Sequence, residues 1–439
     1  MSVLYQISAQ SASGIVASVE DGVTRGQLAP GAVLPPVRAL AASLGISPAT
    51  VAAAYQRLRS RGVVVSAPRR GVRVAPRPPL SIRAAEPVPA GVRDLASGNP
   101  DPRLLPRLLT HHDQQAVTPR LYGEPSMLPA LADLARAQLE TDGIRATHVA
   151  VTSGAMDGIE RVLGAHLRPG DCVAVEDPGY TGVLDLLRAM GLEPAGIRLD
   201  ERGPLPDRLA AVLSGGACAL ILTPRAQNPT GAALDAERAG EVAAVLETHP
   251  DVLVIEDDHA GPVAGAAYRT TTTGRRRWAV VRSVSKSLGP DLRVAVLAGD
   301  PITLRRVEGR QRLGPGWVSG VLQQLVADLW ADGAVTAQLT EAASAYAARR
   351  AALIAALAAH DLRAAGASGL NVWVAVPEEG AVSSGLLRAG WAVQPGEPYR
   401  LASPPAVRIT TAALTEPEAV RVAADLAALF TPAARTRRA

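Results

Sequence analysis

The sequence has few cysteines and no long apolar run, and each shortage excludes a class of protein. Its 439 residues include two cysteines, Cys172 and Cys218. Their spacing suits neither a disulfide framework nor a metal site, so we expect two small buried side chains and no bound metal. No stretch of about 18 apolar residues occurs, and no charged-then-apolar segment opens the chain. We therefore expect no membrane span, no secretion signal and a cytoplasmic location.

Lysine is almost absent. Of the 45 lysines and arginines, Lys286 is the only lysine. Arginine replaces lysine on a surface at little cost, but a guanidinium group cannot form a Schiff base with a carbonyl compound. A lysine that persists in a chain with so strong a preference for arginine is therefore a candidate for amine chemistry, and its neighbours decide the matter.

Acidic residues are scarce at the N-terminus. Residues 1–80 contain nine arginines and two acids, Glu20 and Asp21, which gives a formal charge of +7. The whole chain carries +4, so the remainder carries −3. A small basic segment joined to a slightly acidic body is typical of nucleic-acid binders, although a merely solvated basic face would have the same composition.

Residues 1–75 are predicted to form a winged helix-turn-helix domain. Gly45 supplies the turn, Ser47 is a good N-cap, and Pro48 suits the first helical position because its missing N–H costs nothing there. The predicted elements are helices over residues 3–26, 34–43 and 48–60, followed by short strands over residues 63–65 and 72–74.

The second part of the chain has the pattern of an α/β domain. Residues 76–92 contain five prolines and are expected to form a partly extended linker. From residue 93 to about 435, alternating apolar strands and helices predict a mostly parallel sheet, followed by a smaller α+β unit over about residues 330–431. The strands are predicted at 149–153, 173–176, 219–223, 252–256 and 278–281, and the helices at 155–167, 180–190 and 334–359.

The first domain is predicted to bind double-stranded DNA. A helix-turn-helix places the start of its second helix in the major groove, and basic residues on the preceding helix and at the wing meet phosphates. The alternative is a helix-turn-helix used for protein contacts alone. The residues expected at the DNA are Arg38, Ser47, Thr50, Tyr55, Arg69, Arg70 and Gly71.

The surroundings of Lys286 suit a phosphorylated aldehyde cofactor. The lysine follows the apolar strand at 278–281 and has a hydroxyl on each side. Its amine would form an imine with the aldehyde, while Ser283, Ser285 and Arg293 could meet the phosphate.

Other predicted strand ends supply further pieces of such a site. Tyr180 could stack on a pyridine ring, Asn228 could donate to its phenolic oxygen, and one of the carboxylates of Glu256, Asp257 and Asp258 could pair with a protonated ring nitrogen. A strand-to-helix turn offers free N–H groups and a helix dipole to phosphate at Gly154, Ala155 and Met156. Each piece alone is weak, but five in order around the only lysine predict a pyridoxal 5'-phosphate site.

Both parts of the chain resemble known families. The stretch LPPVRALAASLGISPATVAAAYQRL and the following hairpin resemble the DNA-binding domain of the GntR family. The body resembles fold-type-I aminotransferases, and the whole chain is similar to the MocR subgroup of GntR regulators over residues 3 to 431. The resemblance implies an internal aldimine on Lys286, a ring nitrogen bound by Asp257, and a head-to-tail homodimer. It also implies that Tyr122 reaches the phosphate of a neighbouring subunit and that Arg408 binds an amino acid's carboxylate.

Two residues depart from the pattern that the resemblance implies. His259 stands where these proteins usually have a tyrosine that bonds the phenolic oxygen. Arg225 brings an unusual positive charge close to the site, where it could bind an anionic effector or satisfy a nearby carboxylate. The alternative to carboxylate binding for Arg408 is that its side chain lies on a solvent-exposed strand.

Three functions are compatible with these expectations. The leading hypothesis is a regulator whose body senses pyridoxal phosphate, together with an amino acid or amine, and so changes DNA binding. The second is a working aminotransferase with an appended DNA-binding domain. The third is a dimerisation scaffold with an empty site, against which the retained Lys286 argues.

Overall fold

The computed structural model describes residues 5, 7, 9, 11–60, 62–67, 71–75, 88–108 and 120–430. We call residues 5–75 the head and residues 88–430 the body, and each is described by itself. The predicted wing tip with Arg69 and Arg70 lies outside the described residues, and so do residues 76–87 of the linker predicted over residues 76–92. In the described part of the chain, no helix is both long and apolar enough to cross a membrane.

The head is a three-helix unit with a hairpin. Its helices are α1 (Ala12–Thr24), α2 (Val37–Leu44) and α3 (Pro48–Ser60). The antiparallel strands are β1 (Val64–Ala67) and β2 (Gly71–Val74). Aliphatic side chains from all three helices and from both strands form a separate hydrophobic core, so the head has the layered packing expected of a small domain.

The first helix is shorter than the sequence predicts. We expected a helix over residues 3–26, but α1 begins at Ala12 because Ser11 caps it, and the Ser11 Oγ accepts a hydrogen bond from the Gly14 N–H at 3.1 Å. Residues 5, 7 and 9 lie outside any helix. The Tyr5 hydroxyl instead donates to the Ser18 carbonyl, which holds this segment against α1.

The body is built on an eight-stranded sheet in the order β4-β11-β10-β9-β8-β5-β6-β7. β8, β9 and β10 are parallel to one another, whereas β11 is antiparallel to both β10 and β4. The strands are β4 (Val149–Thr152), β5 (Cys172–Asp177), β6 (Glu193–Asp200), β7 (Gly203–Pro204), β8 (Ala219–Leu222), β9 (Leu253–Asp258), β10 (Trp278–Ser283) and β11 (Ala295–Gly299). The parallel strands end at one edge, which is where ligands bind in sheets of this kind.

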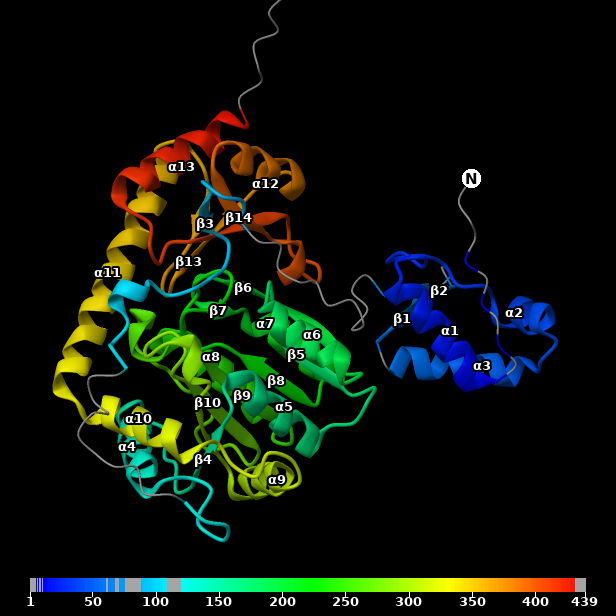
Figure 1. Ribbon diagram of the computed structural model, residues 1–439, viewed down its shortest axis with the longest axis horizontal. Helices are drawn as coiled ribbons and strands as arrows, with labels where there is room; N and C mark the ends of the chain where they lie inside the picture. The colour runs from blue at the N-terminus through cyan, green and yellow to red at the C-terminus, as the bar shows by residue number, and fades with distance from the viewer. Residues whose placement is uncertain are drawn as a thin grey trace, which may run out of the picture. The chain divides into compact units, whose positions relative to one another are not determined.

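Helices flank this sheet and lead to a second one (Figure 1). They are α4 (Pro129–Thr141), α5 (Ala155–His166), α6 (Thr181–Ala189), α7 (Pro206–Ser214), α8 (Ala236–Glu247), α9 (Pro301–Arg312) and α10 (Gly320–Ala331). Short 3-10 turns are η1 (Pro102–Leu104), η2 (Gly261–Ala264), η3 (Pro290–Leu292) and η4 (Glu397–Tyr399). The observed elements confirm a mixed α/β body with a largely parallel central sheet.

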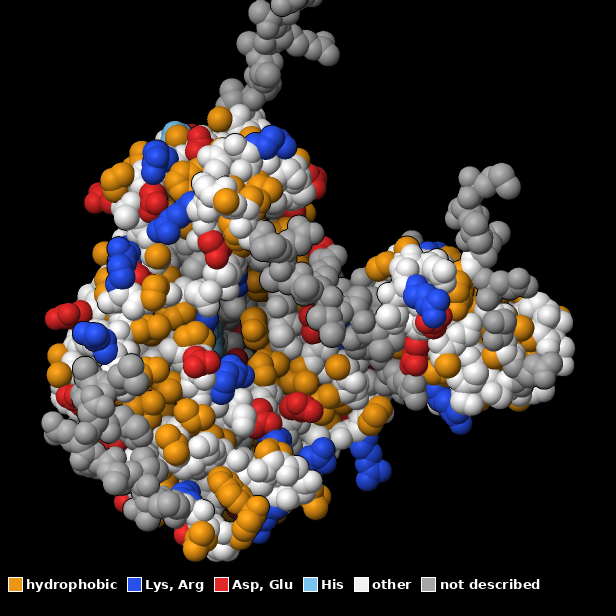
Figure 2. Space-filling model, in the orientation of Figure 1, with side chains coloured by type: hydrophobic (Ala, Val, Ile, Leu, Met, Phe, Trp, Pro, Cys, Tyr) orange, Lys and Arg blue, Asp and Glu red, His pale blue; other side chains and the backbone are white. Residues whose placement is uncertain are grey.

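The C-terminal part of the body is a smaller α+β unit. The long helix α11 (Gly333–Ala358) runs along one side of the body towards α12 (Glu379–Arg388) and α13 (Glu416–Ala428) (Figure 1). The five-stranded sheet has the order β12-β13-β15-β14-β3. Its strands are β3 (Arg93–Leu95), β12 (Ala364–Ala365), β13 (Asn371–Ala375), β14 (Trp391–Pro395) and β15 (Ala406–Thr410). On the face drawn in Figure 2, the body is hollowed between this unit and the larger sheet.

Candidate functional site

The reactive amine lies just beyond the end of a central strand. Lys286 follows β10, and its Nζ donates to the Gly98 carbonyl at 2.7 Å. Burial, together with the nearby Arg408 guanidinium, lowers the pKa of Lys286 to about 8. A larger fraction of neutral amine therefore exists near neutral pH than an exposed lysine would offer, and the neutral amine is the form that attacks a carbonyl carbon.

Asp257 is a buried carboxylate whose charge lacks a partner. It lies in β9, 5% exposed, and its Oδ1 has no hydrogen-bond partner among the described residues. Burial and the charge of Asp258 raise the pKa of Asp257 to about 7. A buried carboxylate of this kind gains most from a cationic N–H donor, which is what a protonated pyridine nitrogen provides.

The neighbours of Asp257 in β9 point to the other face of the sheet and are well bonded. Glu256 accepts hydrogen bonds from Tyr268, Thr270 and Thr271. Asp258 accepts from two arginines, and their charges, opposing the effect of its burial, lower its pKa to about 2. Glu256 and Asp258 are therefore paired within the protein on one face of β9, whereas Asp257 lies on the other face, toward the site.

Arg225 pairs with Asp258, on the face of β9 opposite Asp257. Its Nε and Nη2 donate to the two carboxylate oxygens of Asp258, each at 2.9 Å, and Arg282 Nε donates to the same group at 2.7 Å. Arg225 is 7% exposed. The expectation of an effector contact is therefore wrong, and the alternative of a nearby carboxylate holds, because a bidentate buried ion pair occupies the guanidinium.

The turn between β4 and α5 is the cradle predicted for phosphate. Gly154 has a φ of +91° and precedes α5, whose N-terminus starts at Ala155 and Met156. A Cβ on Gly154 would lie 2.7 Å from an Arg293 guanidinium nitrogen, so the guanidinium closes over the turn. The Gly154 N–H donates to the Thr152 carbonyl at 2.8 Å, so the helix N-terminus at Ala155 and Met156 and the Arg293 cation are the features here that suit an anion.

The two serines predicted to meet the phosphate are bonded to each other. Ser283 ends β10, and its Oγ lies 3.0 Å from the Oγ of Ser285. Ser283 also accepts a hydrogen bond from the Ser285 N–H at 3.2 Å. Because β10, β11 and β4 are adjacent in the sheet, the serines and the Gly154 turn lie at the same edge.

Arg408 is buried and faces the same site. Its Nη1 donates to Asn228 Oδ1 at 3.1 Å, its Nη2 donates to the Ala96 carbonyl, and its guanidinium lies 5.2 Å from the centre of the Tyr399 ring. The Nε has no partner among the described residues, and the side chain is 4% exposed. A place on a solvated strand is therefore excluded for Arg408.

His259 is a neutral neighbour of the amine. Burial and the positive charge of Lys286 lower the pKa of His259 to about 4. An imidazole in this form can donate through one ring nitrogen and accept through the other. It therefore retains the hydrogen-bonding capacity of the tyrosine that the resemblance implies, without that residue's acidity.

The two tyrosines predicted for the site are both exposed. Tyr180 follows the end of β5 after Pro178 and Gly179, and it is 38% exposed. Tyr122 is 91% exposed, and its ring meets the edge of the Trp317 ring at a centroid distance of 5.4 Å. Within one chain, Tyr122 is therefore accessible to a second molecule.

Of the residues predicted to contact DNA, several are exposed on the head, and one is buried. Arg38 is exposed on α2, and Ser47 accepts a hydrogen bond from the Thr50 N–H at 3.1 Å, so it caps α3. Gly71 is exposed and has a φ of +74°. A DNA contact is wrong for Tyr55, because its ring is 1% exposed in the head core and its hydroxyl donates to the Pro35 carbonyl.

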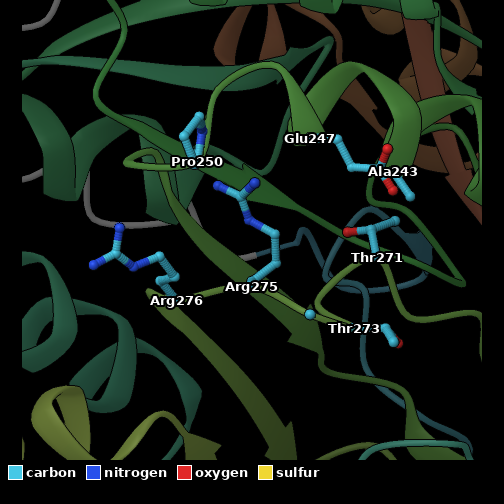
Figure 3. Close-up of a pocket in the computed structure, with 8 residues that line it drawn as sticks. Ala243, Glu247, Pro250, Thr271, Thr273, Arg275 and Arg276 are labelled. Atoms are coloured by element: carbon cyan, nitrogen blue, oxygen red, sulfur yellow. The ribbon is translucent and has the colours of Figure 1, made fainter.

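A shallow pocket elsewhere in the body is distinct from this site (Figure 3). It is lined mainly by the end of α8 and the segment before β10, so it lies at the opposite end of β9 and β10 from Asp257 and Lys286. Arg275 reaches across it and donates to carbonyls of Leu246, His249 and Val252, which fixes the end of α8. The Arg275 guanidinium is thus engaged by the protein.

A buried set of hydrogen bonds around Gln227, which we call the clasp, was not predicted from the sequence. Gln227 is 1% exposed, and its Nε2 donates to Glu176 Oε2 at 3.1 Å and to the Pro178 carbonyl at 2.9 Å. Its Oε1 accepts from the N–H and the hydroxyl of Thr230. The clasp thus ties the segment before Tyr180 to the loop that carries Asn228. Burial raises the pKa of Glu176 to about 7, despite hydrogen bonds that lower it.

We expect Gln227→Leu to lower the free energy of unfolding by about 3 kcal/mol, because several buried polar groups lose their partner at about 1–3 kcal/mol each. The affinity for pyridoxal phosphate should fall about tenfold, because the loop with Asn228 is no longer held. Urea unfolding and a cofactor titration measure the two effects.

Gln324→Leu is the matched control, because Gln324 donates to a partly buried Asp328 one turn along its own helix. It should change the unfolding free energy by less than about 1 kcal/mol. Equal effects of the two substitutions on cofactor affinity would contradict a positioning role for Gln227.

Fold and site together define a class: a winged-helix head followed by an aminotransferase-like body of fold type I. Residues 11–74 match the family described as bacterial regulatory proteins, gntR family, and residues 91–426 match aminotransferase class I and II. The chain therefore belongs to the GntR regulators with an aminotransferase body, the MocR subfamily, and it is a DNA-binding transcription regulator. The MocR resemblance and the α/β fold class are thus confirmed.

Similar proteins include regulators over the whole length and enzymes over the body. The vitamin B6 salvage pathway transcriptional repressor PtsJ of Salmonella typhimurium is 38% identical over 424 residues, 96% of this chain and 98% of that protein. The pyridoxine biosynthesis regulator PdxR of Corynebacterium glutamicum is 30% identical over 248 residues, 54% of this chain and 53% of that protein.

Solved aminotransferases show the same body fold. LysN, an α-aminoadipate aminotransferase from Thermus thermophilus, has a TM-score of 0.67 at 23% identity and covers 77% of this chain and 92% of its own. Pyrococcus horikoshii kynurenine aminotransferase has a TM-score of 0.70 at 22% identity, with 77% and 91% covered.

The family and fold imply pyridoxal phosphate, and the residues present fit it. The unpartnered Asp257 oxygen suits a cationic ring nitrogen, and the Gly154 turn under Arg293 suits a phosphate. When bound, the cofactor supplies an electrophilic aldehyde and an electron-withdrawing ring. Lys286 would hold it covalently, Asn228 and His259 would orient its phenolic oxygen, and Tyr180 would cover its face.

Proposed function

We propose that the body senses pyridoxal phosphate held on Lys286, and that this binding changes the affinity of the head for its operator DNA. The observation that carries the proposal is the buried Asp257 carboxylate without a partner among the described residues, at the same sheet edge as a depressed-pKa amine. A buried acid that is left unpaired destabilises the fold, so its retention indicates a ligand that pairs with it. The chain is expected to act in the cytoplasm.

The second ligand is an amino acid or amine. Arg408 is the residue that we assign to the carboxylate of an amino acid, because its buried guanidinium faces Asn228 and has an Nε to spare. A planar guanidinium with free donors binds carboxylates in a bidentate manner. An amine without a carboxylate would leave Arg408 in its contact with the Ala96 carbonyl.

We infer that two chains assemble head to tail. Tyr122 and the neighbouring Leu121 are exposed to 91% and 71%, and large exposed apolar side chains that cluster in this way are typical of subunit interfaces. In the dimer, the Tyr122 hydroxyl would reach the phosphate held by the other subunit.

Transamination is the competing function, because Lys286, Asp257 and Arg408 are all placed as an aminotransferase requires. The neutral His259 favours sensing, since a poorly acidic imidazole stabilises the charge of a phenolic oxygen less than a tyrosine hydroxyl does. Repeated turnover of an amino acid with a keto acid would favour the enzyme over the sensor.

The test is binding to DNA taken from upstream of the protein's own gene. We expect fluorescence anisotropy to give an affinity at least about 100-fold above that for random DNA at the same salt concentration, within the range of specific regulators. Pyridoxal phosphate should change this affinity at least tenfold, a coupling of about 1.4 kcal/mol. Equal affinity for both DNAs, or no response to the cofactor, would contradict the proposal.

A further inference from the structure

A short segment of the body joins the reactive amine to the chain that leads to the head. We call residues Ala96–Gly98, which lie between β3 and η1, the strap. Its Gly98 carbonyl accepts a hydrogen bond from Lys286 Nζ at 2.7 Å, and its Ala96 carbonyl accepts from Arg408 Nη2. The two cationic groups assigned to ligands therefore both hold the strap by its backbone.

The strap is tethered between two fixed points. After it, the Asp101 N–H donates to the Tyr346 hydroxyl at 3.1 Å, and Asp101 Oδ2 accepts from Arg349 at 3.0 Å. Before it, β3 pairs in parallel with β14 at the edge of the smaller sheet. This edge strand is anchored by Leu95, which is 2% exposed in the core of the smaller unit, and by Arg93, which pairs with Glu418 at 3.1 Å. The strap between these anchors and Asp101 is held from the site by Lys286 and Arg408.

The backbone of the strap is shaped for these contacts. Gly98 has a φ of +69°, a conformation that favours glycine. A Cβ at this position would lie 3.2 Å from an Arg408 guanidinium nitrogen. Asp94 shapes the turn into the strap, because its Oδ1 accepts from the N–H groups of Ala96 at 2.8 Å and Ser97 at 3.0 Å.

Cofactor binding removes one tether by its own chemistry. Lys286 Nζ attacks the aldehyde carbon, a C=N bond replaces the C=O bond, and the aldehyde oxygen leaves as water with the two hydrogens that the amine loses. The lysine nitrogen is then fixed at the cofactor and no longer an ammonium with three donors. Its hydrogen bond to the Gly98 carbonyl would then be lost, and Arg408 alone would hold the strap from the site, at Ala96.

We propose that the strap reports cofactor binding to the linker: release of Gly98 loosens the strap and β3, and so changes the restraint on the chain that carries the head. Val88, the first described residue after the linker, lies ten residues before Gly98. This inference rests on the proposed function and names its route of regulation. An anionic ligand that draws Arg408 away from Ala96 would release the second tether in the same direction.

Hydrogen–deuterium exchange of the full-length protein tests the strap. We expect peptides covering residues 93–104 to exchange at least threefold faster with saturating pyridoxal phosphate, while peptides of β9 and β10 slow or stay unchanged. In Lys286→Ala, the same peptides should exchange fast without cofactor and show no response. Unchanged exchange of residues 93–104 on cofactor binding would overturn the proposal.

Asp94→Ala adds a functional readout, with Glu341→Ala, an exposed position on α11, as its control. The Asp94 variant should bind the cofactor with an unaltered absorption band, yet its operator affinity should respond to cofactor at least fivefold less than that of wild type. The control should respond fully. A full response in Asp94→Ala overturns the strap but leaves the regulator intact, whereas a wild type that binds cofactor without any DNA response overturns both.

Discussion

Replacement of Lys286 with alanine is expected to abolish the visible absorption band of bound pyridoxal phosphate and the response of operator binding to it. The only lysine supplies the amine, and its lowered pKa of about 8 makes it reactive near neutral pH. We expect the cofactor affinity to fall at least about 100-fold, because a covalent bond is replaced by polar contacts alone. Absorption titration and anisotropy with operator DNA measure the two losses.

Lys286→Arg is the matched control for charge. A guanidinium keeps the positive charge near Gly98 but forms no C=N bond with an aldehyde. It should therefore lose the band and the DNA response as fully as alanine does. A DNA response that survives in Lys286→Arg would show that charge rather than covalent chemistry carries the signal.

Replacement of Asp257 with asparagine should move cofactor affinity and stability in opposite directions. The variant cannot offer a carboxylate to a protonated ring nitrogen, so the affinity for pyridoxal phosphate should fall about 10- to 100-fold, the worth of one charge-assisted hydrogen bond of about 1.5–3 kcal/mol. Without cofactor, the same change removes a buried carboxylate that lacks a partner among the described residues, so the variant should be more stable than wild type by about 1–3 kcal/mol at pH 8.

The stability difference has a defined pH dependence. Burial and Asp258 raise the pKa of Asp257 from 3.8 to about 7 in the cofactor-free chain. When folding raises the pKa of an acid, the stability that this gives is present at pH values below the unfolded-state pKa. It is lost as the pH rises through the folded-state pKa. The advantage of Asp257→Asn should therefore be small at pH 4 and full at pH 8, by denaturant unfolding. A stability advantage of Asp257→Asn that becomes smaller from pH 4 to pH 8 would contradict the assignment of Asp257 as a buried carboxylate with a raised pKa.

Local sequence rules predicted much of the fold. The cap at Ser47 and the parallel strands that end near Lys286 were predicted from composition and periodicity. The helix predicted at residues 334–359 is observed as α11, shifted by one residue. The first helix was predicted too long, because an apolar pattern continues through Ile7 and Ala9 while the Ser11 cap sets the real start.

Side-chain roles that depend on long-range pairing could not be read from the sequence. The sequence left two roles open for Arg225, an effector contact or an ion pair with a carboxylate. The structure decides for the ion pair, because Arg225 contacts Asp258, which is 33 residues away in the sequence. The clasp at Gln227 joins two segments that are far apart in the sequence, and no spacing rule brings Glu176 to it. Tyr55 was expected at the DNA because it lies on the recognition helix, but whether its ring points inward depends on the packing of all three helices.

Borohydride reduction of the purified protein with pyridoxal phosphate, followed by peptide mapping, tests the covalent link at the centre of this account. A phosphopyridoxyl group should appear stoichiometrically on the peptide that contains Lys286, and the N-terminal amine, the chain's other primary amine, should carry only a trace. A protein that remains unlabelled, or that carries the label on the N-terminal amine alone, would contradict the account.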